Sequence, residues 1–141
     1  MNILFYLTPK ASCEVLYDDE SIREALERME LSGFGALPII RKEDGVYQGL
    51  LTDGDLLWAL KNHCNLDLKE AQAHGIMEIA HRKNYLPVSV STDMNDLMQK
   101  VLDQNFVPVV DDRGTFIGIV TRRSILAQYV ESNWKKSDET A

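Results

Sequence analysis

The sequence predicts a mixed α/β (α+β) fold in which one β-α-β-β-α unit occurs twice along the chain. Two apolar runs each carry an internal proline, Pro38 and Pro108, which are 70 positions apart. Each run is followed by a Gly-x-x-Thr motif, and the two threonines, Thr52 and Thr121, are 69 positions apart. An amphipathic helical pattern precedes each run at a separation of 72. The elements therefore keep their order, and only the lengths of their connections differ.

Each unit begins with a short β-like run followed by a helix. The runs are Cys13–Tyr17 and Val88–Val90. Acidic and hydroxyl residues, which favour helix N-termini, follow them at Asp18–Ser21 and Ser91–Asp93. Apolar residues then recur at helical spacing. They are Ile22, Ala25, Leu26 and Met29 in the first unit and Met94, Leu97, Met98, Val101 and Leu102 in the second.

Each unit ends with two strands and a second helix. The strands flank a turn that ends in glycine, Gly45 or Gly114, which is typical of a hairpin. The predicted strands are Ala36–Ile40 and Val46–Thr52 in the first unit and Phe106–Val110 and Thr115–Thr121 in the second. The helices predicted after them are Asp53–His63 and Arg122–Asn133.

These elements divide the chain into four segments. We expect a first repeat at residues 8–65, a connection at 66–87, a second repeat at 88–131 and a polar tail at 132–141. The connection is expected to hold a short helix at Leu68–His74, followed by the segment Gly75–Glu78, which enters the second unit. The tail is expected to fray, as chain ends do when nothing holds them.

The charge balance limits the classes of partner. The chain has 15 lysine and arginine residues against 22 aspartate and glutamate residues, a formal net charge of −7. This argues against a general nucleic-acid binder but not against a small anionic ligand held by a local cluster. The sequence contains no run of 18 apolar residues, so no membrane span is predicted. The opening residues lack the features of a signal peptide. Cys13 and Cys64 are expected to be reduced thiols, which favours a cytoplasmic location.

The ordered set of motifs, present twice and in register, resembles a tandem pair of cystathionine-β-synthase-type (CBS) domains, called a Bateman module. The family's pattern Gly-x-x-Thr-x-x-Asp is complete at Gly49–Asp55. The segments Leu7-Thr8-Pro9-Lys10 and Thr121-Arg122-Arg123 resemble those of small stand-alone bacterial CBS-pair proteins. The resemblance covers about residues 8–131 and implies two repeats related by pseudo-two-fold symmetry.

The resemblance implies a regulatory protein without catalysis of its own. Such modules bind adenine nucleotides (AMP, ADP or ATP) in clefts between their two repeats, and some stand-alone members bind cyclic di-AMP. Ligand binding would then signal to a separate protein partner, whose identity is unknown. The alternative is a dimeric interaction scaffold whose ligand clefts are vestigial.

A first ligand site is implied at Thr52 and Asp55, three residues apart at a helix start. Unpaired N–H groups and the positive end of the helix dipole favour an oxygen-rich ligand there. The Asp55 carboxylate could accept hydrogen bonds from two ribose hydroxyls. The adenine ring would be held by Val88, Phe106, Val107 and Pro108 of the second repeat. The alternative is that Thr52 and Asp55 only cap the helix.

A second site is implied at Thr121, Arg122, Arg123 and Ser124, where Ser124 stands in place of the family's aspartate. Two guanidinium groups suit phosphate, so this site favours a more anionic ligand such as cyclic di-AMP. Its other members would be Ser12, Cys13, Glu14, Gly35, Ala36, Leu37 and Pro38. The alternatives are that the site has decayed or that the arginines are solvated, although the helix dipole disfavours cations there.

The helix at 53–63 is apolar on more than one side, because Leu56, Leu57, Trp58 and Leu60 surround much of its circumference. Such a helix is buried beyond its own unit. The resemblance implies a homodimer through this helix, which contains Trp58, and the matching helix, which contains Ile125.

Neither metal chemistry nor catalysis is predicted. His63, His74 and His81 are 11 and 7 positions apart, and the two cysteines fit no zinc pattern. Asp53 and Asp55 could form a carboxylate pair, but no base or nucleophile recurs beside them. We therefore expect no cofactor other than the nucleotide as a regulatory ligand. A hydrolase or transferase acting on the bound nucleotide remains an alternative.

Overall fold

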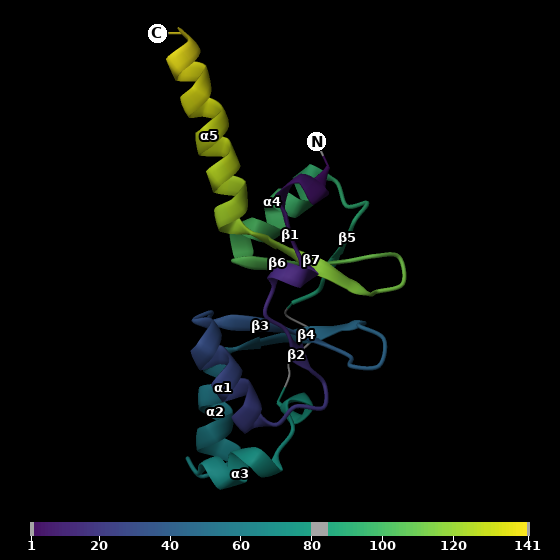
Figure 1. Cartoon of the computed structure of the whole chain (residues 1–141), viewed down its shortest axis with the longest axis vertical. Coiled ribbons are helices and arrows are strands. Elements are labelled where there is room, and N and C mark those ends of the chain that lie inside the picture. Colours follow the sequence, from purple (N-terminus) through teal and green to yellow (C-terminus); the bar gives the residue numbers. More distant parts are fainter. Residues whose placement is uncertain (1, 80–84, 141) are drawn as a thin grey trace. The chain divides into compact units, whose positions relative to one another are not determined.

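The computed structural model describes residues 2–79 and 85–140, with residues 134–140 as backbone alone. The strands are β1 (Leu7–Pro9), β2 (Leu16–Tyr17), β3 (Ala36–Ile40), β4 (Tyr47–Thr52), β5 (Val88–Ser89), β6 (Phe106–Val110) and β7 (Phe116–Thr121). The α-helices are α1 (Ile22–Ser32), α2 (Asp53–His63), α3 (Leu68–Ala73), α4 (Met94–Asp103) and α5 (Arg122–Thr140). Three 3-10 helices are η1 (Ile3–Tyr6), η2 (Lys10–Ser12) and η3 (Ile76–Glu78). Both predicted β-α-β-β-α units are present in the predicted order (Figure 1).

The chain forms two units that are not continuous halves. The first-repeat unit contains Glu14–Leu86 and Arg113–Phe116. The second-repeat unit contains Met1–Cys13, Pro87–Asp112 and Ile117–Ala141. Each unit has its own sheet and its own hydrophobic core.

The first-repeat sheet has the strand order β2-β3-β4. β2 and β3 are parallel, which requires a crossover connection, and α1 supplies it. β3 and β4 are antiparallel, as the predicted hairpin requires. The hairpin turn ends at Gly45, whose φ of 78° is in the left-handed region that glycine adopts without strain. Figure 1 shows α1 and α2 on one face of this sheet.

The core of this unit combines the two predicted periodicities. Ile22 and Ala25 point inward from α1, and Leu37 and Ile39 point inward from β3, all with at most 1% of their surface exposed. Their spacings are those of one helical face and of alternate strand residues. The helical and strand patterns of the sequence therefore meet in one core.

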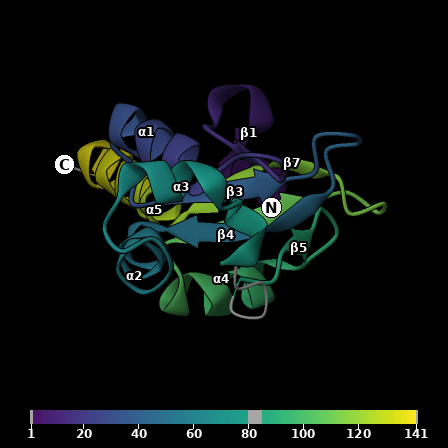
Figure 2. The same ribbon diagram turned by 90° about the horizontal axis from the view of Figure 1, so that it is seen from below.

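The connection after the first repeat is part of this core rather than a linker. α3 packs against α1 (Figure 2), and Ala71 and Ile76 are completely buried. The backbone also joins this segment to the start of α1, because Ile22 N donates to His74 O at 2.9 Å. Residues 66–79 therefore complete the first-repeat unit.

The second-repeat sheet has the order β1-β7-β6-β5 and gains a strand from the chain's first residues. β1 is antiparallel to β7, with Leu7 opposite Val120 and Pro9 opposite Gly118. Ile3, from the preceding η1, is 1% exposed in the core of this unit. Residues 8–13, which the sequence assigned to the first repeat, therefore pack with the second repeat, where they extend the sheet beyond β7.

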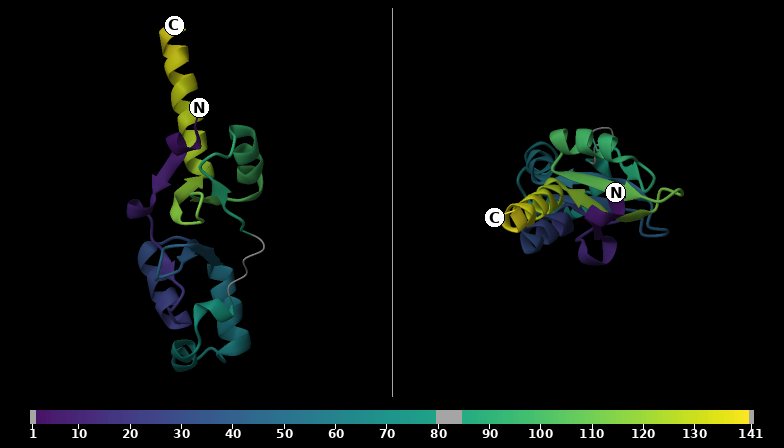
Figure 3. Two further views of the ribbon diagram at one scale, coloured as in Figure 1. Left: turned by 90° about the vertical axis from the view of Figure 1, so that its right-hand side faces the viewer. Right: turned by 90° about the horizontal axis from the view of Figure 1, so that it is seen from above.

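The last helix continues past its predicted end. α5 reaches Thr140, whereas the sequence predicted an end at Asn133 followed by a frayed tail. No glycine or proline interrupts residues 122–140, so the backbone has no local reason to leave the helix. Figure 3 shows α5 as a single long helix that extends away from its own sheet.

The turn Arg113–Phe116 of the second repeat belongs to the first-repeat unit. Tyr47 N donates to Gly114 O and Phe116 N donates to Gly45 O, both at 3.0 Å. The rings of Tyr47 and Phe116 stack with centroids 6.3 Å apart. Tyr47 Oη donates to Tyr85 O at 2.8 Å, and burial raises the pKa of Tyr47 above its ordinary value. Paired hairpin ends and one aromatic stack thus hold this turn in place.

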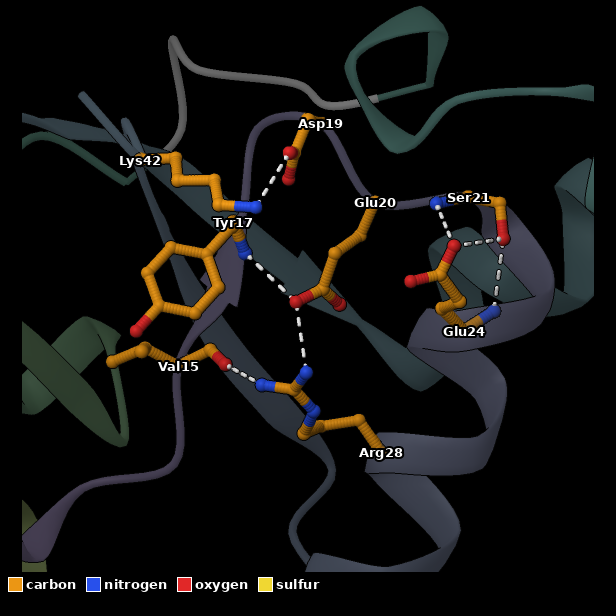
Figure 4. Close-up of polar contacts among 8 residues, drawn as sticks. All are labelled: Val15, Tyr17, Asp19, Glu20, Ser21, Glu24, Arg28 and Lys42. Atoms are coloured by element: carbon orange, nitrogen blue, oxygen red, sulfur yellow. Dashed lines mark hydrogen bonds and ion pairs between the residues drawn. The ribbon is translucent and has the colours of Figure 1, made fainter.

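A buried ion pair links α1 to the first strand of the unit (Figure 4). Glu20 is 5% exposed, and its Oε1 accepts from Arg28 Nη2 at 2.8 Å and from Tyr17 N at 3.3 Å. Arg28 Nη1 donates to Val15 O at 2.6 Å. Glu20 Oε2 has no hydrogen-bond partner among the described residues. Burial raises the pKa of Glu20, and the charge of Arg28 opposes that rise.

Candidate functional site

The Thr52–Asp55 pair at the start of α2 forms a reciprocal capping box. Asp55 N donates to Thr52 Oγ1 at 3.1 Å, and Thr52 N donates to Asp55 Oδ2 at 2.9 Å. The capping alternative raised by the sequence is therefore present in the structure. Only one carboxylate oxygen is used, because Asp55 Oδ1 has no hydrogen-bond partner among the described residues. The cap fixes the carboxylate in place and leaves acceptor capacity for a ligand.

Thr121 and Ser124 form the matching box at the start of α5. Ser124 N donates to Thr121 Oγ1 at 3.0 Å, and Thr121 N donates to Ser124 Oγ at 3.3 Å. Ser124 Oγ lies 2.8 Å from Thr121 O and 3.3 Å from Tyr6 O, and it donates toward these carbonyls. Serine thus replaces aspartate as the capping residue in the second repeat.

The structure brings some predicted residues together inside the first-repeat unit. Ala36 lies opposite Thr52 in the β3–β4 ladder. Asp53 N donates to Gly35 O at 2.9 Å. Gly35 and Ala36, which the sequence placed in the second site, therefore adjoin the Thr52–Asp55 box of the first.

The strand residues predicted to contact the adenine ring do not all lie on the same face of their sheets. Leu37, Val88 and Val107 are 1%, 4% and 0% exposed and lie in the cores of their own units. Strand alternation points the side chains of Leu37 and Val107 inward with Ile39 and Val109. Ligand contact at these three positions stays a prediction. The neighbouring positions on β3 and β6 face the other way. They are Ala36 and Phe106, which are partly buried, and Pro38 and Pro108, which are buried.

The two predicted phosphate-binding arginines differ. Arg122 Nε donates to Val101 O at 2.8 Å, and its Nη2 donates to Leu102 O at 3.1 Å. Its guanidinium therefore caps the C-terminal end of α4, which explains a cation at the start of α5. Arg123 is exposed and makes no hydrogen bond or ion pair within the described part of the chain. Arg123 is therefore the arginine whose guanidinium is available to a ligand.

Replacing Arg122 by methionine is expected to lower the free energy of unfolding by about 1–2 kcal/mol, because two carbonyls of α4 lose charged donors. Urea unfolding measures this change. Arg123→Met is the matched control and is expected to change stability by less than about 0.5 kcal/mol. Equal effects of the two substitutions would contradict the capping role of Arg122.

The remaining predicted residues lie near η2 and the chain that follows it. Ser12 and Glu14 are exposed. The Cys13 thiol donates to Pro9 O at 3.3 Å, and burial raises its pKa. Cys13 and Cys64 are both free cysteines in the structure. Ser12 and Cys13 belong to the second-repeat unit and Glu14 to the first-repeat unit.

A hollow of about 200 Å³ lies beside Asp55 within the first-repeat unit. It is lined by Asp55, Trp58, Ala59, Asn62, His63, Glu78 and Ile79. A second hollow of about 320 Å³ adjoins it, and both are lined by His63, Glu78 and Ile79. The sequence reasoning missed Glu78 and Ile79, because it treated their segment as a connection. Ile76 lies 73 positions after Ile3, and both are buried in 3-10 helices, but this correspondence becomes visible only in the structure.

The helices predicted to form a dimer present apolar side chains. Leu57 and Trp58 of α2 are each 57% exposed, while Leu56 on its other side is 1% exposed. On α5, Leu126, Tyr129 and Val130 are exposed. Ile125 is 6% exposed and packs in the core of the second-repeat unit. Its helix keeps an apolar surface, but Ile125 itself is not part of it.

The described residues hold neither a metal-ligand cluster nor a membrane-spanning helix. The described residues contain no group of three or more histidine, cysteine, aspartate or glutamate side chains that could hold a metal ion. His81 lies outside the described residues, so the structure places only His63 and His74 of the three histidines. Within the described ranges, no helix is both long and apolar enough to cross a bilayer.

The CBS domain family matches the chain twice, at residues 9–62 and 76–131. The chain belongs to the CBS domain family. The predicted family and the predicted pair of repeats are thus confirmed. The family match indicates no enzymatic class.

Solved structures resemble this CBS pair over nearly its whole length. CbpB in complex with c-di-AMP is 26% identical, with a TM-score of 0.89 over 99% of this chain and 91% of that chain. CbpB from Streptococcus agalactiae is 27% identical, with a TM-score of 0.82 over 95% of this chain and 83% of that chain. The predicted fold class is confirmed by these structures.

A curated relative is much longer than this chain. The choline transport ATP-binding protein OpuBA of Bacillus subtilis is 27% identical over 125 residues, which are 87% of this chain and 30% of that protein. The CBS pair therefore spans less than a third of that relative's length.

Proposed function

We propose that this CBS pair is a regulatory sensor of adenine nucleotides. The observation that carries the proposal is the Asp55 carboxylate, which its capping box holds through one oxygen beside a hollow. The c-di-AMP named for the CbpB complex, whose sequence is 26% identical, supports an adenine-containing ligand. That each ligand is shared between the two repeats stays a prediction from the family resemblance.

In this proposal Asp55 accepts hydrogen bonds from ribose hydroxyls through Oδ1. Bonds to an ionised acceptor are about twice as strong as neutral ones, so the carboxylate distinguishes a nucleotide from a free base. Phe106 and Pro108 are proposed to supply apolar contacts to the adenine ring at this Asp55 site. At the second site, Ala36 and Pro38 are proposed to supply these contacts, and Arg123 is proposed to contact phosphate.

Binding would act by shifting a conformational equilibrium. A ligand changes the population of two states only by its differential affinity for them. We propose that the shift alters a surface read by a separate cytoplasmic protein, and that the CBS pair acts as a homodimer through α2 and α5. Light scattering on the purified protein tests the dimer, and a monomer would overturn it.

The test of ligand binding is Asp55→Ser, which keeps a hydroxyl for the capping box as Ser124 does. AMP binding measured by calorimetry is expected to weaken about tenfold or more, because a charged acceptor is lost. Asp93→Ser is the matched control: Asp93 caps α4 through Asp96 N at 2.9 Å, and serine caps equally well. The control is expected to bind AMP as the unaltered protein does.

A panel of AMP, ADP, ATP, cyclic di-AMP and GTP in a thermal-shift assay identifies the ligand. A ligand at 100 times its dissociation constant adds about 2.7 kcal/mol of stability. Stabilisation by adenine nucleotides but not by GTP is the expected result. Incubation followed by chromatography should return every nucleotide unchanged, and a product would favour a hydrolase or transferase.

The exposed apolar residues Leu57 and Trp58 of α2 and Tyr129 of α5 favour a second candidate, an interaction scaffold without a ligand. The same thermal-shift panel separates the two. Failure of every nucleotide to stabilise the protein would leave the scaffold as the better proposal.

A further inference from the structure

The chain passes between its two units at four points, and Tyr47 contacts residues beside three of them. The crossings follow Cys13, Leu86, Asp112 and Phe116. Tyr47 contacts residues 85, 114 and 116, each of which lies within two positions of a crossing. Tyr47 is therefore attached to most of the covalent connections that join the units.

Tyr47 makes all of these contacts inside the first-repeat unit. Its N donates to Gly114 O at 3.0 Å, and its Oη donates to Tyr85 O at 2.8 Å. Its ring stacks on that of Phe116, with 24° between the ring planes, and Phe116 is 1% exposed. The side chain is thus held at its tip by a hydrogen bond and along its ring by an aromatic partner.

The contacts between the two hairpins are reciprocal. Tyr47 and Phe116 are 69 positions apart, and so are Gly45 and Gly114. Tyr47 N donates to Gly114 O, and Phe116 N donates to Gly45 O in the same way. Equivalent residues of the two repeats therefore bind each other, and neither hairpin end can leave without breaking both hydrogen bonds and the stack.

The turn at Arg113–Phe116 is covalently continuous with the second-repeat sheet. It joins β6, which ends at Val110, to β7, which begins at Phe116 and continues into the second-repeat unit. When that sheet opens, the turn is released, and Tyr47 loses its stacking partner and a backbone acceptor. Residues in direct contact have interaction energies that make their stabilities interdependent.

From these contacts we propose that Tyr47 couples the two CBS repeats, so that a change in the stability of one repeat is transmitted to the other. A ligand that stabilises one repeat then stabilises the other through the same junction. This inference goes beyond nucleotide sensing and does not depend on which ligand binds.

The test combines Tyr47→Leu with a substitution in the second-repeat core. Leu97 is completely buried in that core, so Leu97→Ala strongly destabilises the second-repeat unit. Native-state hydrogen exchange at Leu37 and Ile39 of β3 reports on the first-repeat unit. In the otherwise unaltered protein, Leu97→Ala is expected to accelerate exchange at these two amides at least about tenfold. In the Tyr47→Leu background, the same substitution is expected to change it by less than about threefold.

Exchange at Val107 and Val109 of β6 measures the direct effect of Leu97→Ala, which is expected in both backgrounds. Tyr17→Leu is the matched control. Tyr17 is also a partly buried tyrosine of the first-repeat unit, but it lies on β2, where it pairs with Ile40. This control is expected to transmit the Leu97→Ala effect as fully as the unaltered protein.

Phe116→Leu removes the stack from the other side and is expected to reduce transmission as Tyr47→Leu does. It keeps the test available if circular dichroism shows that Tyr47→Leu does not fold. Full transmission in folded Tyr47→Leu protein would overturn the coupling role of Tyr47, and so would an effect confined to β6 in the otherwise unaltered protein. Neither result bears on nucleotide sensing, which calorimetry of Asp55→Ser tests separately.

Discussion

Replacing Gly118 by alanine is expected to lower the free energy of unfolding by about 3–5 kcal/mol. A Cβ at this position would meet the backbone oxygen of Thr8 and lie 2.9 Å from Leu7 Cδ1, and the φ of +157° is strained for other residues. The backbone of β1 cannot yield as a side chain does, so the strand must move away from β7. Its departure would also expose Ile3, a loss of about 1.5–3 kcal/mol by itself. Urea unfolding measures the total.

Gly33→Ala separates this steric effect from the effect of backbone conformation. Gly33 has a φ of +73° and ends α1, but nothing lies within 4 Å of a Cβ built on it. The Gly33→Ala substitution is expected to lower the free energy of unfolding by only about 1–2 kcal/mol, which is the cost of the backbone conformation alone. Hydrogen exchange at Leu7 and Thr8 should accelerate in the Gly118 variant and not in the Gly33 variant. Equal costs for the two variants would refute the close approach of β1 to Gly118.

Replacing Arg28 by methionine is expected to destabilise the protein by about 2–4 kcal/mol at neutral pH. Removing one member of a buried ion pair leaves the other charge uncompensated. Glu20 would lose its bond at 2.8 Å, and Val15 O would lose its donor. The estimate is below that for a fully buried pair, because the Arg28 side chain is 34% exposed.

The pH dependence of the Arg28 variant follows from the direction of the Glu20 pKa. Burial already raises this pKa in the folded protein, and removal of Arg28 removes the interaction that opposes the rise. Between the pKa of Glu20 in the unfolded chain and its higher pKa in the folded chain, the folded chain holds a proton that the unfolded chain releases. The free energy of unfolding therefore falls as pH rises through this range. The destabilisation should therefore shrink as pH is lowered toward 4.

Arg23→Met is the control for this prediction. Arg23 lies on the same helix and pairs with Glu27 at 3.5 Å, but both side chains are well exposed. Its loss is expected to cost less than about 0.5 kcal/mol at any pH, as exposed pairs do. A Glu20-linked pH dependence in this variant would contradict the assignment to the buried pair.

Local signals were enough to predict the repeated elements. The proline-containing strands match β3 and β6 residue for residue, because apolar runs bounded by turn residues leave little choice of boundary. α2 also begins and ends where predicted, since Thr52 caps it. The candidate pair Thr52 and Asp55 followed from this helix start.

Features that depend on partners distant in sequence could not be predicted in this way. Nothing near Leu7 indicates that it pairs with Val120, and nothing near Arg122 indicates that it caps α4. The inward orientation of Leu37 and Val107 follows from strand alternation, but only once the core face is known. Glu78 and Ile79 could be recognised as residues that line the hollow beside Asp55 only once the fold of the connection was known.

The pairing of β1 with β7 has a consequence for the order of folding during synthesis. Most of the first-repeat unit, residues 14–86, is continuous and can begin to fold while later residues are still being made. The second-repeat sheet instead joins Leu7 to Val120, so its earliest strand must wait for one of the last. Until then Ile3 and Leu7 have no core to enter and are exposed to chaperones and proteases. Moving this strand behind α5 by circular permutation would shorten that wait.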